Sequence, residues 1–142
     1  MNYSIFDLKI IPTKGGDVMH ALKASEESFK TFGELYFSWI LPDTVKAWKK
    51  HKIMTMNLIV PIGLVKFVLF DDQVKNRRFH EIVIGNIEEE KGFYKRLTIN
   101  PNTWFGFKCI SKCESLVVNC ADIEHYPEEI VKADLESIPY NW

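Results

Sequence analysis

The sequence predicts an all-β protein, a sandwich or barrel of short antiparallel strands. Short segments rich in valine, isoleucine, phenylalanine and tyrosine recur along the chain, and turn-forming residues separate them. Aromatic residues, which favour strands, make up 13% of the 142 residues. This length suits one domain, and the chain has no internal repeat or low-complexity segment. We therefore expect residues 1–142 to form a single domain.

The expected strands, in chain order, cover residues 4–11, 34–41, 45–48, 54–60, 64–70, 80–84, 94–99, 104–110 and 115–120. Combinations of Gly, Pro, Asn and Asp separate several of them, and Pro61-Ile62-Gly63 is short enough to predict a hairpin. Residues 16–32 have a loosely helical spacing of apolar residues. Pro127, followed by two glutamates, predicts one or two helical turns near the C-terminus.

The charge is nearly balanced, with 18 basic and 19 acidic residues and a net charge of -1. No overall field attracts nucleic acid or an acidic membrane, so an anionic ligand needs a local cluster of positive charge. No window approaches the roughly 20 apolar residues of a membrane helix. The N-terminus lacks a signal-peptide pattern. We expect a soluble cytoplasmic protein without a nucleic-acid or membrane partner.

Metal and disulfide sites are not expected. The four histidines form no HxH or HExxH pattern and have no cysteine at ligand spacing, so we expect no metal. The three cysteines cannot all pair, and their spacing does not match a redox motif. They are interpreted as thiols in a reducing compartment.

The interior of a small barrel holds side chains or one small ligand, so we seek a site there. Residues 45–52 place one imidazole, His51, among four lysines and Trp48. This segment is either a solvated basic strand end or a phosphate-binding rim beside a titratable base. Composition alone favours the first interpretation.

Two later segments carry further candidates. Trp104 and Phe105 either belong to the barrel core or form the wall of a ligand cavity. Asn119 is a polar residue in an apolar strand and needs a hydrogen-bond partner if it faces inward. His125 and Tyr126, which follow that strand, can donate a proton or can simply lie in a surface loop.

Several blocks together resemble short members of the dTDP-4-dehydrorhamnose 3,5-epimerase family. The blocks are residues 33–38, 47–51, 57–72, 100–107, 122–129 and 138–142, in the family's order. The resemblance implies a cupin-type jelly-roll β-barrel, a homodimer and no cofactor. It also implies a nucleotide-sugar substrate of the dTDP-4-keto-6-deoxyglucose kind. In this chemistry, a side-chain base removes an acidic proton beside a ketone.

The same resemblance assigns residue roles. His51 falls on the catalytic base, Asn119 on the catalytic tyrosine and Asn57 on a lysine near the enolate oxygen. His125 falls on a substrate-contacting tyrosine, so the proton donor is His125, Tyr126, Tyr36 or water. The resemblance places the acidic partner of the histidine in an extended C-terminal region, so we expect this partner to be missing for His51. The expected substrate-binding residues are Lys14, Tyr36, Trp48, Lys49, Lys50, Arg96, Trp104 and Phe105.

The expected function is that of an isomerase: an epimerase of a nucleoside-diphosphate 4-keto-6-deoxy sugar in surface-polysaccharide (O-antigen or capsule) synthesis. Because Asn119 replaces the tyrosine, three alternatives stay open: a nucleotide-sugar 3,4-ketoisomerase, a non-catalytic sugar-nucleotide-binding cupin and a plain interaction module.

Overall fold

The computed structural model describes residues 2–72, 78–87 and 91–142, and strands are the main regular structure in this part of the chain. The strands are β1 (Tyr3–Asp7), β2 (Ile10–Ile11), β3 (Val18–Met19), β4 (Glu34–Ile40), β5 (Val45–His51), β6 (Met56–Phe70), β7 (His80–Asn86), β8 (Lys95–Ile99), β9 (Trp104–Cys109), β10 (Ser115–Ala121) and β11 (Ile130–Lys132). Single 3-10 turns form η1 (Lys91–Phe93), η2 (Pro127–Glu129) and η3 (Leu135–Ser137). Among these elements, no helix is long and apolar enough to cross a membrane.

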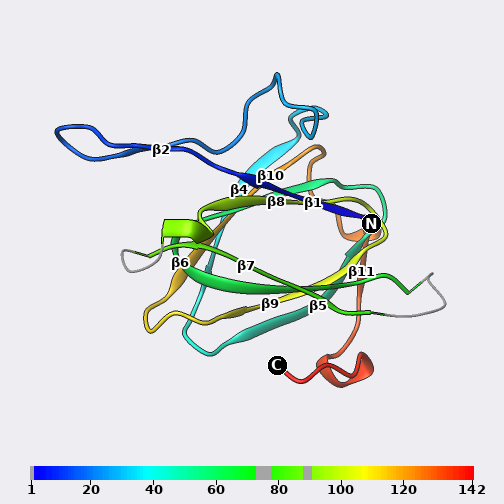
Figure 1. Cartoon of the computed structure of the whole chain (residues 1–142). Helices are drawn as coiled ribbons and strands as arrows, with labels where there is room; N and C mark the ends of the chain where they lie inside the picture. Colours follow the sequence, from blue (N-terminus) through cyan, green and yellow to red (C-terminus); the bar gives the residue numbers. More distant parts are fainter. Residues whose placement is uncertain (1, 73–77, 88–90) are drawn as a thin grey trace.

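The strands form two facing layers, which share β6 (Figure 1). One layer has the order β1-β8-β6-β10-β4. The other has the order β7-β6-β9-β5-β11. Every pairing is antiparallel, which confirms the predicted all-β barrel.

Strand β6 is the main difference from the sequence prediction. The hairpin expected at residues 61–63 does not form, because β6 continues through it as one strand of 15 residues. Its first part pairs with β8 and β10, and its second part pairs with β7 and β9. Pro61 and Gly63 lie where the strand passes from one layer to the other, and Gly63 has a φ of 82°. Proline and glycine therefore mark a bend within a strand here.

The N-terminal region also differs from the prediction. The strand expected at residues 4–11 is split into β1 and β2, and residues 16–32 contain the short strand β3 and turns but no helix. Strands β2 and β3 pair as a hairpin that projects from the barrel (Figure 1). The helical turn predicted at Pro127 is confirmed as η2, although the chain then enters the unpredicted strand β11.

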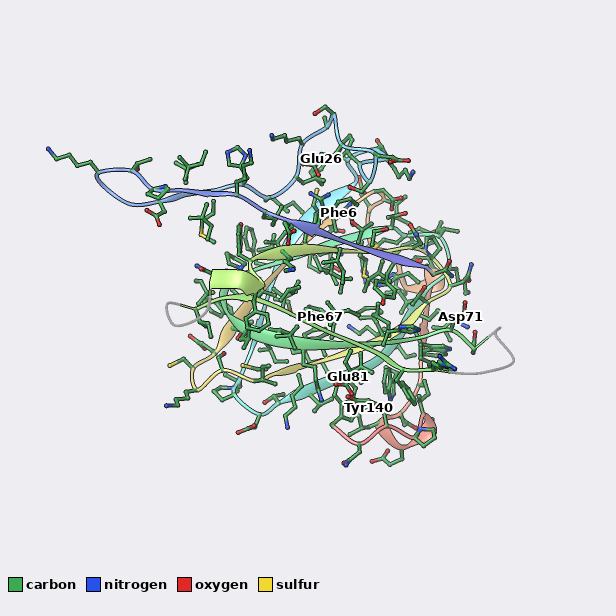
Figure 2. All side chains as sticks on the ribbon, in the orientation of Figure 1. Phe6, Glu26, Phe67, Asp71, Glu81 and Tyr140 are labelled. Carbon is green, nitrogen blue, oxygen red and sulfur yellow. The ribbon has the colours of Figure 1, made fainter. Side chains whose placement is uncertain are left out.

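Apolar side chains form two buried clusters. The main core lies between the layers and includes Phe67, which Figure 2 shows inside the barrel. A second cluster surrounds Trp48 and Ile138, where the C-terminal segment covers the outer side of the layer that contains β5 and β9. Tyr140, in this segment, donates a 2.6 Å hydrogen bond to Glu81 (Figure 2). The two sides of the β5–β9 layer are thus each covered by their own apolar cluster, one inside the barrel and one beneath the C-terminal segment.

Candidate functional site

A cavity of about 120 Å³ lies inside the barrel between the two layers. It is lined by Tyr36, Ser38, Lys46, Lys49, His51, Met56, Leu58, Phe105, Phe107, Val117, Asn119 and Ile130. Most of these residues come from β4, β5, β9 and β10, so residues far apart in the sequence meet there. The mixture of apolar walls and a few polar groups is typical of a small-molecule site.

His51 ends strand β5 and is buried at the cavity wall. Its Nδ1 contacts the Oε1 of Glu129, which is also buried. The other carboxylate oxygen, Oε2, accepts hydrogen bonds from the backbone N–H groups of Lys52, at 3.0 Å, and Ile53, at 3.4 Å. On the side of the cavity, the imidazole stacks on Phe105 with 5.8 Å between the ring centroids. These contacts fix the orientation of the ring.

The charge of Glu129 determines which nitrogen of His51 is available. Burial raises the pKa of Glu129, but the hydrogen bond and charge of His51 and the backbone N–H groups of Ile53 and Met54 lower it more, so the net pKa lies below the usual value. An ionised Glu129 accepts a hydrogen bond from Nδ1–H. The lone pair of a neutral His51 is then on Nε2. This is the arrangement that a general base requires.

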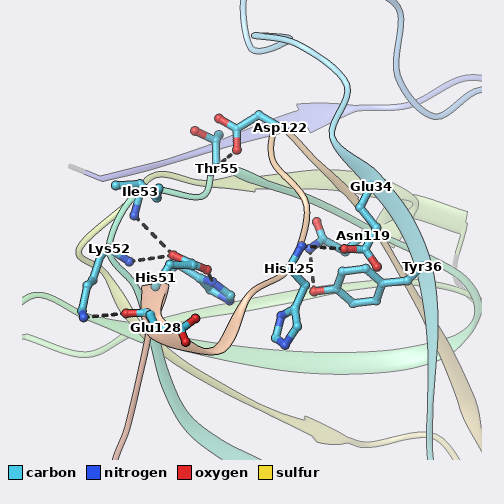
Figure 3. Close-up of polar contacts among 11 residues, drawn as sticks. Glu34, Tyr36, His51, Lys52, Ile53, Thr55, Asn119, Asp122, His125 and Glu128 are labelled. Carbon is cyan, nitrogen blue, oxygen red and sulfur yellow. Dashed lines mark hydrogen bonds and ion pairs between the residues drawn. The ribbon is translucent and has the colours of Figure 1, made fainter.

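Tyr36 and Asn119 form a second polar pair in the cavity. The Nδ2 of Asn119 donates a 2.9 Å hydrogen bond to the Tyr36 hydroxyl oxygen (Figure 3). Burial raises the pKa of Tyr36, and this hydrogen bond partly offsets the rise. The buried Oδ1 of Asn119 has no hydrogen-bond partner among the described residues. The pair therefore offers a protonated phenol and an open amide oxygen.

Lys46 and Lys49 supply positive charge at the same cavity. On a regular strand, residues three apart face opposite sides. The pairing of β5 with β9 shifts register between these two lysines, and this irregularity brings both to the cavity. Burial, followed by the charges of Lys132 and Lys46, lowers the pKa of Lys49. An anionic ligand relieves the repulsion among such ammonium groups.

Five sequence-predicted site residues that belong to strands lie outside the cavity: Trp48, Lys50, Asn57, Arg96 and Trp104. The reason is the alternation of side chains along a strand. Each is next in sequence to a residue that faces the interior. The structure thus directs these five side chains away from the site at which they were expected.

Three of them pack on the outer side of the β5–β9 layer. Trp48 and Trp104 belong to the second apolar cluster. Lys50 forms an ion pair of 2.7 Å with Asp72, and its Nζ lies 4.9 Å from the Trp104 ring centroid. Trp104 also donates a 2.8 Å hydrogen bond to Asp72. The ammonium group of Lys50 is thus already paired.

Asn57 and Arg96 lie on the outer side of the opposite layer. The Oδ1 of Asn57 accepts a 2.7 Å hydrogen bond from Thr98, and its Nδ2 donates to a backbone carbonyl at 3.3 Å. Arg96 is fully buried and holds the segment before β4 through Glu26, at 2.5 Å, and Ser28, at 2.7 Å. Both are occupied with structural contacts.

The remaining expected residues lie in loops. Lys14 is exposed in the turn of the β2–β3 hairpin, and His125 and Tyr126 are exposed between β10 and η2. The backbone N–H of His125 donates a 2.7 Å hydrogen bond to Glu34 (Figure 3). Of the predicted residues, His51, Tyr36, Lys49, Phe105 and Asn119 meet at the cavity.

Sequence reasoning missed Glu129, Lys46 and Ser38. The expectation that His51 lacks an acidic partner was wrong, because Glu129 provides one. The signal available was Pro127-Glu128-Glu129, which we interpreted only as the start of a helical turn. No group of three or more His, Cys, Asp or Glu side chains in the described part of the chain is arranged to hold a metal ion.

Comparison with known proteins identifies relatives over nearly the whole chain, although no protein-family model matches. The chain is 26% identical to the probable low-salt glycan biosynthesis epimerase Agl13 of Haloferax volcanii, over 95% of this chain and 85% of that protein. It is 36% identical to a dTDP-sugar isomerase of Desulfovibrio desulfuricans G20, with a TM-score of 0.90 over 99% of this chain and 90% of the other.

More distant solved structures share the fold. A sugar 3,4-ketoisomerase of Thermoanaerobacterium thermosaccharolyticum, solved with TDP, has a TM-score of 0.72 at 20% identity over 93% of this chain and 88% of that one. A dTDP-4-dehydrorhamnose 3,5-epimerase of Sulfolobus tokodaii has a TM-score of 0.81 at 15% identity over 99% and 81%. The expected cupin-type barrel and the family resemblance are confirmed. With 36% identity over almost the full length of both chains, this protein belongs to the dTDP-sugar isomerase family, a group of enzymes related to the sugar-nucleotide epimerases.

Proposed function

We propose that this protein is an epimerase of a nucleoside-diphosphate 4-keto-6-deoxy sugar, such as dTDP-4-keto-6-deoxyglucose. The observation that carries the proposal is the buried pair of His51 and Glu129 at the wall of the barrel cavity. His51 acts as the base through Nε2 and removes a proton from a carbon beside the ketone. Glu129 orients the imidazole and stabilises the imidazolium that forms.

The cavity also suits the two ends of such a substrate. A volume of about 120 Å³ is enough for the sugar end alone, so the nucleotide extends outward. Lys46 and Lys49 carry the charge needed near the diphosphate. Phe105, which stacks on His51, provides an apolar wall beside the reacting carbon. This set replaces the predicted Lys14, Lys50 and Trp48.

The second candidate reaction is 3,4-ketoisomerisation, in which one base moves a proton between neighbouring carbons. Two observations favour it as the alternative: His51 is the only histidine at the cavity among the described residues, and 3,4-ketoisomerases are among the structures that share the fold. The two reactions differ in their product. Epimerisation inverts a carbon, whereas ketoisomerisation moves the ketone.

The proposal includes a setting for the enzyme. One relative in glycan biosynthesis supports a role in surface-polysaccharide synthesis. All three cysteines lie in the described part of the chain and are unpaired, which supports a reducing, cytoplasmic location. The exposed apolar outer face of β4 supports a homodimer.

The test is proton NMR in heavy water with dTDP-4-keto-6-deoxyglucose. We expect the signals of the protons beside the ketone to disappear with wild-type protein and to persist with His51→Asn, because the base is then lost. His20→Asn makes the same change outside the cavity and serves as the control. If His51→Asn exchanged these protons at the wild-type rate, the assignment of the base would be refuted. If wild-type protein exchanged none of them, the proposed reaction would be refuted.

A further inference from the structure

The facing walls of the cavity carry different chemical groups. His51 comes from β5, in the layer with β9 and β11. Tyr36 and Asn119 come from β4 and β10, which pair with each other in the opposite layer. Asn119 pairs directly with Tyr36 in the register of these strands. Figure 3 shows the imidazole and the phenol on opposite sides of the barrel interior.

We infer that Tyr36 is the catalytic acid, that Asn119 is its positioning residue, and that together they return the proton on the sugar face opposite His51. This inference rests on the proposed function and goes further, because it assigns the acid and selects inversion over ketoisomerisation. By resemblance, Asn119 stands where the family has its tyrosine. The structure brings another phenol, from the neighbouring strand, against that asparagine.

His51 and Tyr36, together with water, account for every proton that moves in this reaction. His51 Nε2 takes the proton from the carbon, and the electrons of the broken C–H bond move to the carbonyl oxygen and form an enolate. The Tyr36 O–H then gives its proton to the same carbon from the other face, and the enolate electrons form the new C–H bond. The phenolate regains a proton from water and the imidazolium releases one to water, so no oxidant, reductant or co-reactant is needed.

The hydrogen-bond geometry leaves the phenol proton available. Because the Asn119 amide donates to the Tyr36 oxygen, the hydroxyl proton is free to point into the cavity. Burial favours the protonated phenol at neutral pH. The unpartnered Oδ1 of Asn119 is a ready acceptor for a sugar hydroxyl, which fixes the ring between the two groups.

The other charged or titratable groups near the phenol determine how its ionisation behaves. These groups are Glu34 on the same strand, Glu129 on η2, and His51, Lys46 and Lys49 on β5. The two carboxylates raise the pKa of Tyr36, as burial does. Loss of the Asn119 amide removes the hydrogen bond that lowers it. An Asn119→Ala variant therefore needs a higher pH to ionise the phenol.

The experiment compares Tyr36→Phe with His51→Asn and wild type on dTDP-4-keto-6-deoxyglucose in heavy water. It follows deuterium uptake and inverted product separately. We expect Tyr36→Phe to retain His51-dependent uptake while inverted product falls by about 10²–10⁴-fold, the usual contribution of a general acid. Retained uptake also shows that the variant is folded. Tyr3→Phe removes a phenol outside the cavity and is the matched control.

Asn119→Ala supplies the second readout. We expect its kcat to fall and the alkaline limb of its pH profile to move to higher pH, a shift that simple loss of packing does not produce. Inverted product from Tyr36→Phe at the wild-type rate would overturn the inference. The inference would also be overturned if wild-type protein exchanged protons but produced only a sugar with a moved ketone. That result would still be consistent with His51 as the base. If wild-type protein takes up no deuterium at all, the proposed function itself is refuted, and this outcome is distinct from uptake without inverted product.

Discussion

At the scale of single residues, the site depends on two pairs of side chains that orient each other. The Glu129 carboxylate holds one nitrogen of His51, and Asn119 holds the hydroxyl of Tyr36. Each of the two proposed reactive side chains therefore has one partner that orients it, which leaves the Nε2 of His51 and the hydroxyl proton of Tyr36 for the ligand. Such preorganisation lowers the cost of reaching the transition state.

Glu129→Gln tests this orientation. The amide keeps the shape of the side chain but removes the charge that holds Nδ1–H. We expect kcat to fall by about 10²–10⁴-fold, as when the acid of a histidine–acid pair is neutralised. Steady-state kinetics would measure it, with Glu128→Gln, an exposed neighbour, as the control. A kcat equal to that of wild type contradicts the role.

Glu129→Gln should also change the thermal stability of the protein in a pH-dependent way. The pKa of Glu129 is lowered in the folded state, so its contribution is present above the unfolded-state pKa and is lost as pH falls through the folded value. We expect wild type to melt at a higher temperature than Glu129→Gln at pH 7, and the difference to shrink below about pH 4. Thermal unfolding followed by circular dichroism checks this, and a constant difference would argue against an ionised carboxylate.

At the scale of elements, the continuous strand β6 builds the barrel. It pairs with four strands in turn and belongs to both layers. Its inward residues are even-numbered before the bend, as at Leu58 and Val60, and odd-numbered after it, as at Val65 and Phe67. The bend at residues 61–63 thus keeps an apolar face on the interior of both layers.

Gly63→Ala should disrupt this bend. Gly63 has a φ of 82°, and a Cβ there would lie 2.1 Å from the Ser115 hydroxyl oxygen. We expect a loss of about 1–3 kcal/mol in the free energy of unfolding, as for other overpacked sites. Urea denaturation measures the change. Gly15→Ala, where a Cβ meets nothing within 4 Å, is the control, and equal stability of the two variants would disprove the prediction.

At the scale of the whole molecule, one outer face stays apolar. Strand β4 pairs only with β10 among the described strands, and its outward residues Leu35, Phe37 and Trp39 are 48%, 62% and 50% exposed. Its inward residues include Tyr36 and Ser38 at the cavity. The strand that carries the proposed acid therefore also carries the proposed dimer interface. An exposed apolar edge of this kind is normally covered by a partner.

Phe37→Glu tests the dimer. A charge at the centre of this face opposes its burial, so we expect wild type to sediment as a dimer and the variant as a monomer in analytical ultracentrifugation. Leu135→Glu changes an exposed apolar residue on η3, which lies on the other layer, and should leave the mass unchanged. A monomeric wild type at micromolar concentration would refute the interface.

The sequence by itself determined the all-β class, most strand positions and the family, and it identified His51 as a candidate base. Alternating apolar residues and turn residues are local signals, and the family blocks stand in a fixed order along the chain. It also identified Tyr36 and Asn119, but as separate candidates. Their pairing depends on β4 lying beside β10, a contact between residues 83 positions apart.

The tertiary structure alone decided which candidates reach the cavity and which acid serves His51. Lys49 and Lys50 are both lysines, yet their side chains face opposite sides of β5. The register shift after Lys46 also interrupts the regular alternation of side chains along this strand. Glu129 is 78 positions from His51, and only the pairing of β11 with β5 brings them together. Which distant strands lie side by side depends on the folded sheet, and the alternation of residues along a single strand does not reveal it.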